Sequence, residues 1–110
     1  MRFYHGTDWA SAEDLRDNGL DESKAAHYNG SGEFWATTDP IVATWFAHGN
    51  PANGIPARFE FDLSDQVFQR LLTAPSPGVV VQVPNAYEFL PESFELVNLH
   101  MSNQQIVRVP

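Results

Sequence analysis

The feature that most restricts the fold is the alternation of apolar and polar side chains in residues 57–63, ARFEFDL. Phe59, Phe61 and Leu63 fall on one side of an extended chain, which is the pattern of a half-buried strand. A sheet with one apolar face needs other elements to cover that face. With 43% hydrophobic and 13% aromatic residues, the chain has enough apolar surface to build such a core.

Three segments have the sequence signals of helices, namely residues 7–20, 39–50 and 64–73. Thr7 or Asp8 can cap the first helix, and Gly19 occupies the position where a glycine usually ends one. In the second helix Asp39 is the expected cap and Pro40 the first helical residue. Ser64 is expected to cap the third.

The remaining apolar segments are expected to be strands, at residues 2–5, 33–38, 57–63, 79–83, 86–90, 93–101 and 104–109. Helices then occupy the first two-thirds of the chain and most strands lie in the last third. This order predicts an α+β fold with a mainly antiparallel sheet. The length indicates a single domain over residues 1–110. Neither GxGxxG nor GxxxxGK[ST] occurs, which argues against dinucleotide-binding and P-loop α/β folds.

The charge and the cysteine content exclude several classes of function. Fourteen acidic residues against six basic ones give a net charge of −8, so direct nucleic-acid binding and anionic membranes are disfavoured as partners. The absence of cysteine excludes disulfides and thiolate catalysis. The histidines form no metal-binding motif, so no metal is expected. Without an apolar export signal, the expected compartment is the cytoplasm.

The first candidate site residues are in RFYHGT, where His5 and Thr7 flank Gly6. Glycine lets another molecule approach the backbone closely, and the hydroxyl of Thr7 adds a polar group. The alternative is structural: Gly6 makes only the turn into the first helix, and His5 is a half-buried strand residue.

The second candidate is the aromatic pair Phe34 and Trp35, because neighbouring strand residues point to opposite faces. One ring must therefore face the core and the other a cleft or solvent, where it can stack on a planar ligand. Trp45 in the next helix is expected to complete the wall of such a cleft. Alternatively, all of these rings belong to the core.

The third candidate is Glu88, a carboxylate between Tyr87 and Phe89. Such a carboxylate lies either on the solvated face of a strand or in a lined site. In a lined site it can stabilise a developing cation or accept a proton.

Together these segments resemble the ADP-ribosyltransferase fold, in the branch shared by diphtheria toxin and the poly-ADP-ribose polymerases. YHGT resembles the first block of that branch. GEFWATTDPIVATWFA resembles the second, with Phe34 at the tyrosine position, and YEFLPESFELVN resembles the last, with Glu88 as the acid. Small bacterial members are the most similar, over residues 2–47 and 87–98.

The resemblance implies a split antiparallel sheet with two or three short helices and NAD, the substrate, in a crevice between two small sheets. The backbone of Gly6 would pair with the nicotinamide amide. His5, assisted by Thr7, would bind a ribose hydroxyl of the adenosine half.

The resemblance also implies how the nicotinamide end is held. Phe34 would stack on the nicotinamide ring, and Trp35 and Trp45 complete the set of cofactor-binding residues. Glu88 would bind the 2′-hydroxyl of the nicotinamide ribose and favour its oxocarbenium character. His5, Phe34 and Glu88 are thus the expected catalytic set.

The implied activity is glycosyl transfer, in which ADP-ribose moves from NAD to a macromolecular acceptor, expected to be a protein. A toxin or effector role, with an antitoxin or immunity partner, would fit. Phe34 lacks the phenol of the usual tyrosine, so one hydrogen bond is missing. Ala86, two residues before Glu88, removes the second carboxylate or amide of the arginine-modifying branch.

Three hypotheses remain open. The chain is an NAD-dependent transferase, or an inactive NAD- or ADP-ribose-binding or acidic protein-interaction module of the same fold, or an unrelated α+β domain. Glu92 and Glu95 lie close enough in sequence to compete with Glu88 for the role of the acid.

Overall fold

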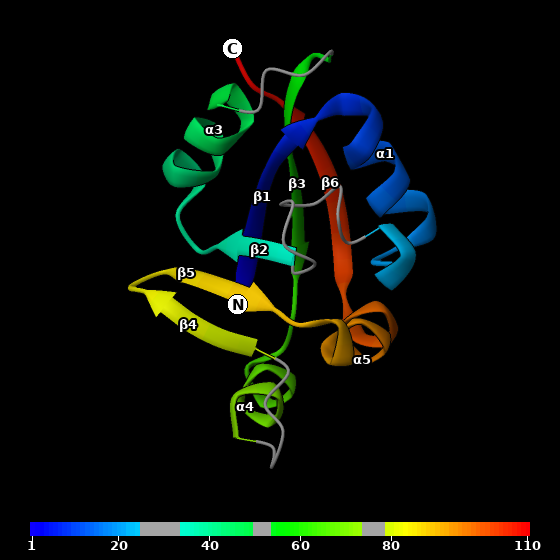
Figure 1. Cartoon of the computed structure of the whole chain (residues 1–110), viewed down its shortest axis with the longest axis vertical. Helices are drawn as coiled ribbons and strands as arrows, with labels where there is room; N and C mark the ends of the chain where they lie inside the picture. Colours follow the sequence, from blue (N-terminus) through cyan, green and yellow to red (C-terminus); the bar gives the residue numbers. More distant parts are fainter. Residues whose placement is uncertain (25–33, 50–53, 74–78) are drawn as a thin grey trace.

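A six-stranded antiparallel sheet, in the order β4-β5-β2-β1-β3-β6, organises this computed structural model (Figure 1). The structure describes residues 1–24, 34–49, 54–73 and 79–110. The strands are β1 (Arg2–Asp8), β2 (Phe34–Thr37), β3 (Pro56–Asp62), β4 (Val79–Val83), β5 (Ala86–Phe89) and β6 (Ser102–Arg108). The helices are α1 (Trp9–Asn18), α3 (Pro40–Gly49), α4 (Asp65–Thr73) and α5 (Phe94–His100), with 3₁₀ turns η1 (Glu22–Lys24) and η2 (Pro91–Ser93). The α+β class with a predominantly antiparallel sheet is therefore confirmed.

The sheet consists of two three-stranded halves that meet between β1 and β2. β1 pairs with β3 along its whole length, from Arg2↔Asp62 to Asp8↔Pro56, but with β2 only at Tyr4↔Thr37. In Figure 1, β2, β5 and β4 run across the long axis, whereas β1, β3 and β6 run along it. The junction between β1 and β2 is therefore the place where the backbone ladder of the sheet is weakest.

The core is built from aromatic side chains of both halves. Phe3 of β1 contacts Phe61 of β3 with ring centroids 5.5 Å apart and Phe89 of β5 at 5.4 Å. All three are fully buried or nearly so. Aromatic pairs at such separations stabilise a core beyond the area they bury, so these rings hold the halves together although the ladder between them is short.

The predicted caps of the helices are confirmed. The Asp8 carboxylate accepts hydrogen bonds from the amide and hydroxyl of Ser11, at 2.8 and 2.9 Å, and Gly19 ends α1 with φ of 77°. Asp39 accepts from the Ile41 amide at the start of α3, and the Ser64 hydroxyl accepts from the Val67 amide at the start of α4. Local sequence signals thus determine where these helices begin.

Residues 93–101, expected to form a strand, instead lie mainly in η2 and α5. Phe94 and Val97 are buried three residues apart, which is the spacing of a helix and not of a strand. The apolar content of this segment concealed its helical period. Helices are consequently not confined to the first two-thirds of the chain.

β1 also differs from its prediction, because it continues through Gly6 to Asp8 where the sequence indicated an end at His5. The expected turn at 74–78 lies outside the described residues, as do most of the expected loops at 21–32 and 50–56. No helix in the described part of the chain has the length and apolar character needed to cross a bilayer.

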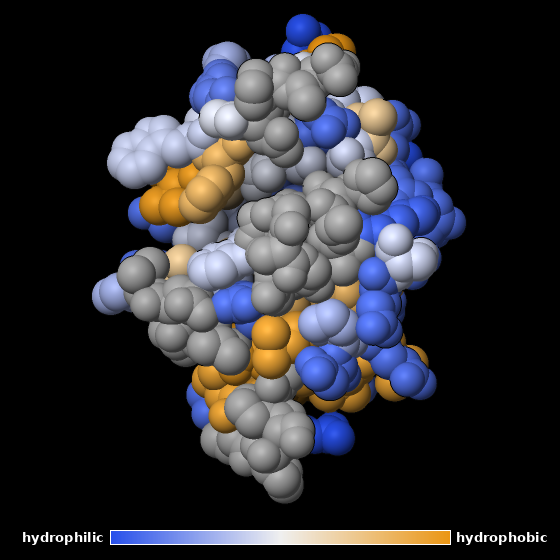
Figure 2. All heavy atoms as spheres, viewed as in Figure 1, coloured by the Kyte–Doolittle hydropathy of each residue, from blue (hydrophilic) through white to orange (hydrophobic). Residues whose placement is uncertain are grey.

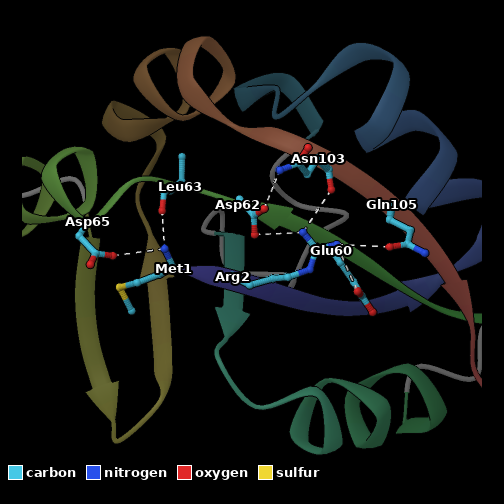
Figure 3. A network of polar contacts seen from close by, with 8 residues as sticks. All are labelled: Met1, Arg2, Glu60, Asp62, Leu63, Asp65, Asn103 and Gln105. Carbon is cyan, nitrogen blue, oxygen red and sulfur yellow. Dashed lines mark hydrogen bonds and ion pairs between the residues drawn. The ribbon is translucent and has the colours of Figure 1, made fainter.

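A polar network fixes the half of the sheet that contains β1, β3 and β6 (Figure 3). Arg2 donates to Asp62 at 3.0 Å and to Glu60 at 3.4 Å, and the Asn103 amide donates to Asp62 at 2.9 Å. Glu60 is buried, and Arg58 also forms an ion pair with it at 3.0 Å. Buried charges are tolerated when they are paired in this way, so the network holds this half of the sheet in register.

Gly6 is the point at which α3 packs on the sheet. A Cβ atom at this position would lie 2.0 Å from the carbonyl oxygen of Ala43 and 2.6 Å from the nitrogen of Ala47. Both alanines are buried on the inner side of α3. Gly6 is therefore required by the close approach of the helix and does not form a turn.

Replacing Gly6 with alanine is expected to lower the free energy of unfolding by about 3 kcal/mol, because the methyl group meets helix backbone that cannot rotate away. Urea denaturation measures this change. The matched control is Gly49→Ala in α3, where a new methyl group has no atom within 4 Å. This substitution should leave the free energy of unfolding nearly unchanged. Equal effects of the two substitutions would contradict the packing described here.

Candidate functional site: the junction of β1, β2 and β5

The three predicted segments come together at the junction of the two half-sheets. His5 lies on β1, and its Nδ1 donates a hydrogen bond of 2.6 Å to the carbonyl oxygen of Trp35 on β2. Trp35 is in turn the register partner of Glu88 on β5. Because β2 and β5 are paired at this point, the backbone at Glu88 lies one strand spacing, about 4.8 Å, from that of Trp35.

His5 is buried and uncharged at neutral pH. Desolvation lowers its pKa from 6.5 to about 4, against the opposing effects of the Trp35 carbonyl and the Asp8 charge. A carbonyl can only accept, so Nδ1 must carry the proton and Nε2 must be the unprotonated nitrogen. His5 is therefore a fixed hydrogen-bond acceptor.

A cavity of about 240 Å³ lies between β1 and α1. It is lined by His5, Thr7, Ala10, Ser11, Asp14, Leu15 and Lys24. Thr7 is two residues from His5 on the same strand, so their side chains share a face. Imidazole and hydroxyl groups along one wall suit a ligand that carries hydroxyl groups.

The far side of this cavity is charged. Lys24 donates to the two oxygens of Asp14 at 2.9 and 3.1 Å, and the Asn18 amide donates at 2.8 Å. The hydrogen bond from Lys24, followed by that from Asn18, holds the pKa of Asp14 below its usual value. Asp14 is therefore ionised at neutral pH and positions the lysine at the cavity.

Phe34 does not occupy the position expected for it. Its ring is fully buried and stacks on the His5 imidazole, with centroids 4.2 Å apart and planes inclined by 28°. It also contacts the core ring of Phe89. In this structure Phe34 has no surface on which a nicotinamide ring can stack. The ring of Phe34 instead packs against His5.

Trp35 is the aromatic side chain on the same face as Glu88. Phe34 faces the core with Phe89, its register partner, so Trp35 and Glu88 point to the opposite face. Trp35 is half-buried. Its indole Nε1 is buried and has no acceptor among the described residues. The expectation that one ring of the pair faces the core and the other does not is confirmed.

Trp45 does not complete a wall beside Trp35. Ala43 and Ala47 face the sheet. Trp45 is two positions from each of them, so it lies on the opposite side of the helix. Trp45 is accordingly 68% exposed, as are Ile41 (61%) and Phe46 (59%) on the same helix. Figure 2 shows apolar atoms gathered over α3. The helix thus presents an apolar outer surface, separate from the junction.

The structure distinguishes Glu88 from the neighbouring carboxylates. Glu88 is half-buried on β5 and lies directly across from Trp35 of β2. Glu92 is exposed in η2 and Glu95 is exposed in α5. Of the three, Glu88 is the one on the sheet next to the junction.

Sequence reasoning missed the α1 side of the cavity. The spacing of Ala10, Ser11 and Asp14 places them on one face of a helix, and this signal is present in the sequence. Lys24 carried no such signal, because it reaches Asp14 from η1, ten residues further along the chain.

No protein-family model, curated protein or solved structure matches this chain.

The burial of neutral His5 makes stability depend on pH. Below pH 6.5 the unfolded chain binds a proton at this residue, whereas the folded protein binds one only near pH 4. Stability is expected to fall over this interval by about 3 kcal/mol. Urea midpoints measured from pH 7 to pH 4 test this expectation.

The control variant is His5→Asn, which keeps a donor for the Trp35 carbonyl but does not titrate. It should lose less stability than the wild type between pH 6.5 and pH 4. His48→Asn, at an exposed position on α3, is the matched histidine substitution outside the junction. Identical slopes for the wild type and His5→Asn would show that His5 is not the buried neutral group.

Proposed function

We propose that this chain is an ADP-ribosyltransferase-like domain that uses NAD as its substrate and transfers ADP-ribose to a macromolecular acceptor, most simply a protein. The observation that carries the proposal is that residues 5, 35 and 88 lie on three adjacent strands at the split of the sheet, with His5 on the face toward α1 and Trp35 and Glu88 on the opposite face. These residues are far apart in sequence, and each belongs to one of the three segments that carry the resemblance.

The architecture supports the proposal. The resemblance implies two small sheets with a crevice between them, and the six strands form two halves joined by the single register pair Tyr4↔Thr37. Four α-helices occur in the described residues where two or three were expected. The additional helix, α5, lies at the periphery in Figure 1, away from the β1–β2 junction.

The cavity under α1 suits the adenosine half of NAD. The unprotonated Nε2 of His5 is an acceptor for a ribose hydroxyl, and the hydroxyl of Thr7 lies on the same wall. The ammonium of Lys24 lies at this cavity in an ion pair with Asp14, so a phosphate of the ligand would have to compete with that carboxylate for it.

The nicotinamide half would lie at the junction itself. Within β1 and β2, pairing occurs only at Tyr4↔Thr37, so Gly6 lies beyond the paired part of the β1 edge. Its backbone is the proposed partner for the carboxamide. α3 covers the face of the sheet at Gly6, so the ligand must approach along the strand edge that faces β2.

The proposed reaction breaks the bond between C1′ of the ribose and the ring nitrogen of nicotinamide. The electron pair goes to that nitrogen and neutralises its charge, which leaves C1′ cationic. Glu88 accepts a hydrogen bond from the 2′-hydroxyl and stabilises the positive charge. The acceptor then attacks C1′ and releases its proton to Glu88 or to water. The protein contributes mainly fixed electrostatic stabilisation.

Glu88→Gln tests this role, because the amide keeps the size of the side chain and removes its charge. The rate of NAD consumption is expected to fall by roughly 10²- to 10³-fold, as for other preorganised groups. Nicotinamide release, measured with and without added protein acceptors, is the assay. Glu92→Gln, at an exposed carboxylate in η2, should retain the wild-type rate.

Calorimetry with NAD separates the enzyme from an inactive module. NAD binding without turnover in the wild type would overturn the catalytic part of the proposal and leave a binding domain. Absence of both binding and turnover would overturn the whole proposal.

A further inference from the structure

We propose that the indole N–H of Trp35 is a hydrogen-bond donor to the nicotinamide–ribose half of the substrate. This inference rests on the proposed function and adds to it a residue that contacts the substrate. The resemblance places the contact at residue 34, whose ring lies in the core.

The indole nitrogen of Trp35 is unsatisfied within the described residues. Trp35 Nε1 is buried, and no acceptor for it exists in the part of the chain that the structure describes. Nearly all buried donors in folded proteins have a partner, so an exception requires an explanation. A binding site explains it, because the missing acceptor then arrives with the ligand.

The Trp35 ring also has a carboxylate as its neighbour. Trp35 and Glu88 form a direct cross-strand pair on one face of the sheet, and the Cβ atoms of such pairs lie about 5 Å apart. The Trp35 carbonyl is fixed by His5, so the backbone that carries the ring is anchored at the junction. The ring as a whole is half-buried, so part of it stays exposed on this face of the sheet.

A donor beside a carboxylate matches a ligand that both donates and accepts. The 2′-hydroxyl of the nicotinamide ribose donates to Glu88 in the proposed reaction. A neighbouring oxygen of the ribose or of the carboxamide then accepts from Trp35. The indole thereby supplies the hydrogen bond that a phenylalanine at position 34 cannot make, so the absence of tyrosine there does not by itself disable the site.

The direct test is NMR of the tryptophan indoles in the ¹⁵N-labelled domain. The chain has three tryptophans, which give three indole signals, and Trp9 and Trp45 serve as internal references. Nicotinamide mononucleotide and NAD should move the Trp35 signal downfield and slow its exchange with water. Adenosine monophosphate should instead perturb the His5 ring and leave the Trp35 indole unchanged.

A second measurement removes only the N–H. Benzothienylalanine at position 35 replaces the indole nitrogen with sulfur and keeps the shape of the ring. The affinity for NAD should fall about 3- to 10-fold, as expected for one lost hydrogen bond. The melting temperature without ligand should stay unchanged, because the N–H has no partner within the described protein. Trp45→Phe, on the outer surface of α3, should leave NAD affinity unchanged.

The outcomes separate this inference from the proposed function. If NAD binds and shifts His5 but not the Trp35 indole, this inference is wrong and the proposed function stands. If the sulfur analogue lowers the melting temperature of the free protein, the N–H bonds to the protein and the inference is also wrong. If no nucleotide shifts any signal, both proposals fall.

Discussion

The hydrogen bond from His5 to the Trp35 carbonyl is the interaction on which the arrangement of this protein depends. The two half-sheets share a single register pair, so the usual ladder of backbone hydrogen bonds does not position β2 against β1. A buried imidazole supplies the missing connection from the side chain. Its neutrality, enforced by burial, fixes which nitrogen donates and which accepts. One residue thereby joins the halves and provides a polar group to the cavity beneath α1.

The close approach of α3 to Gly6 sets the other side of the junction. The helix lies so near the strand that no side chain fits between them, and its inner surface is made of alanines. This packing leaves the large apolar residues of α3 on the outside, where they cannot line the junction. It also confines access to Gly6 to the edge of the strand. The polar network around Glu60 holds β1 and β3 together, so the edge that faces β2 is presented by a rigid half-sheet.

Much of the local structure was readable from sequence because its causes are local. A capping carboxylate at Asp8, the Asp39–Pro40 pair and the alternation in residues 57–63 act through neighbours only a few residues away. The apolar, β-prone residues in 93–101 are compatible with a strand and with a helix. The burial of Phe94 and Val97, three residues apart, shows that the segment is a helix. The sequence was equally ambiguous about Phe34 and Trp35. The side chains of adjacent strand residues point to opposite faces, but no local signal tells which of the two faces the core.

The sequence by itself determined the helix starts, the half-buried strand, the acidic character and the three segments that supply residues 5, 35 and 88. Only the tertiary structure decided that Phe34 packs on His5, that Trp35 accompanies Glu88 on the opposite face, and that Trp45 points away from the junction. The physical reason is the range of the forces involved. Caps and alternation depend on bonds between near neighbours, whereas the orientation of a ring depends on surfaces contributed by strands that are distant in the chain.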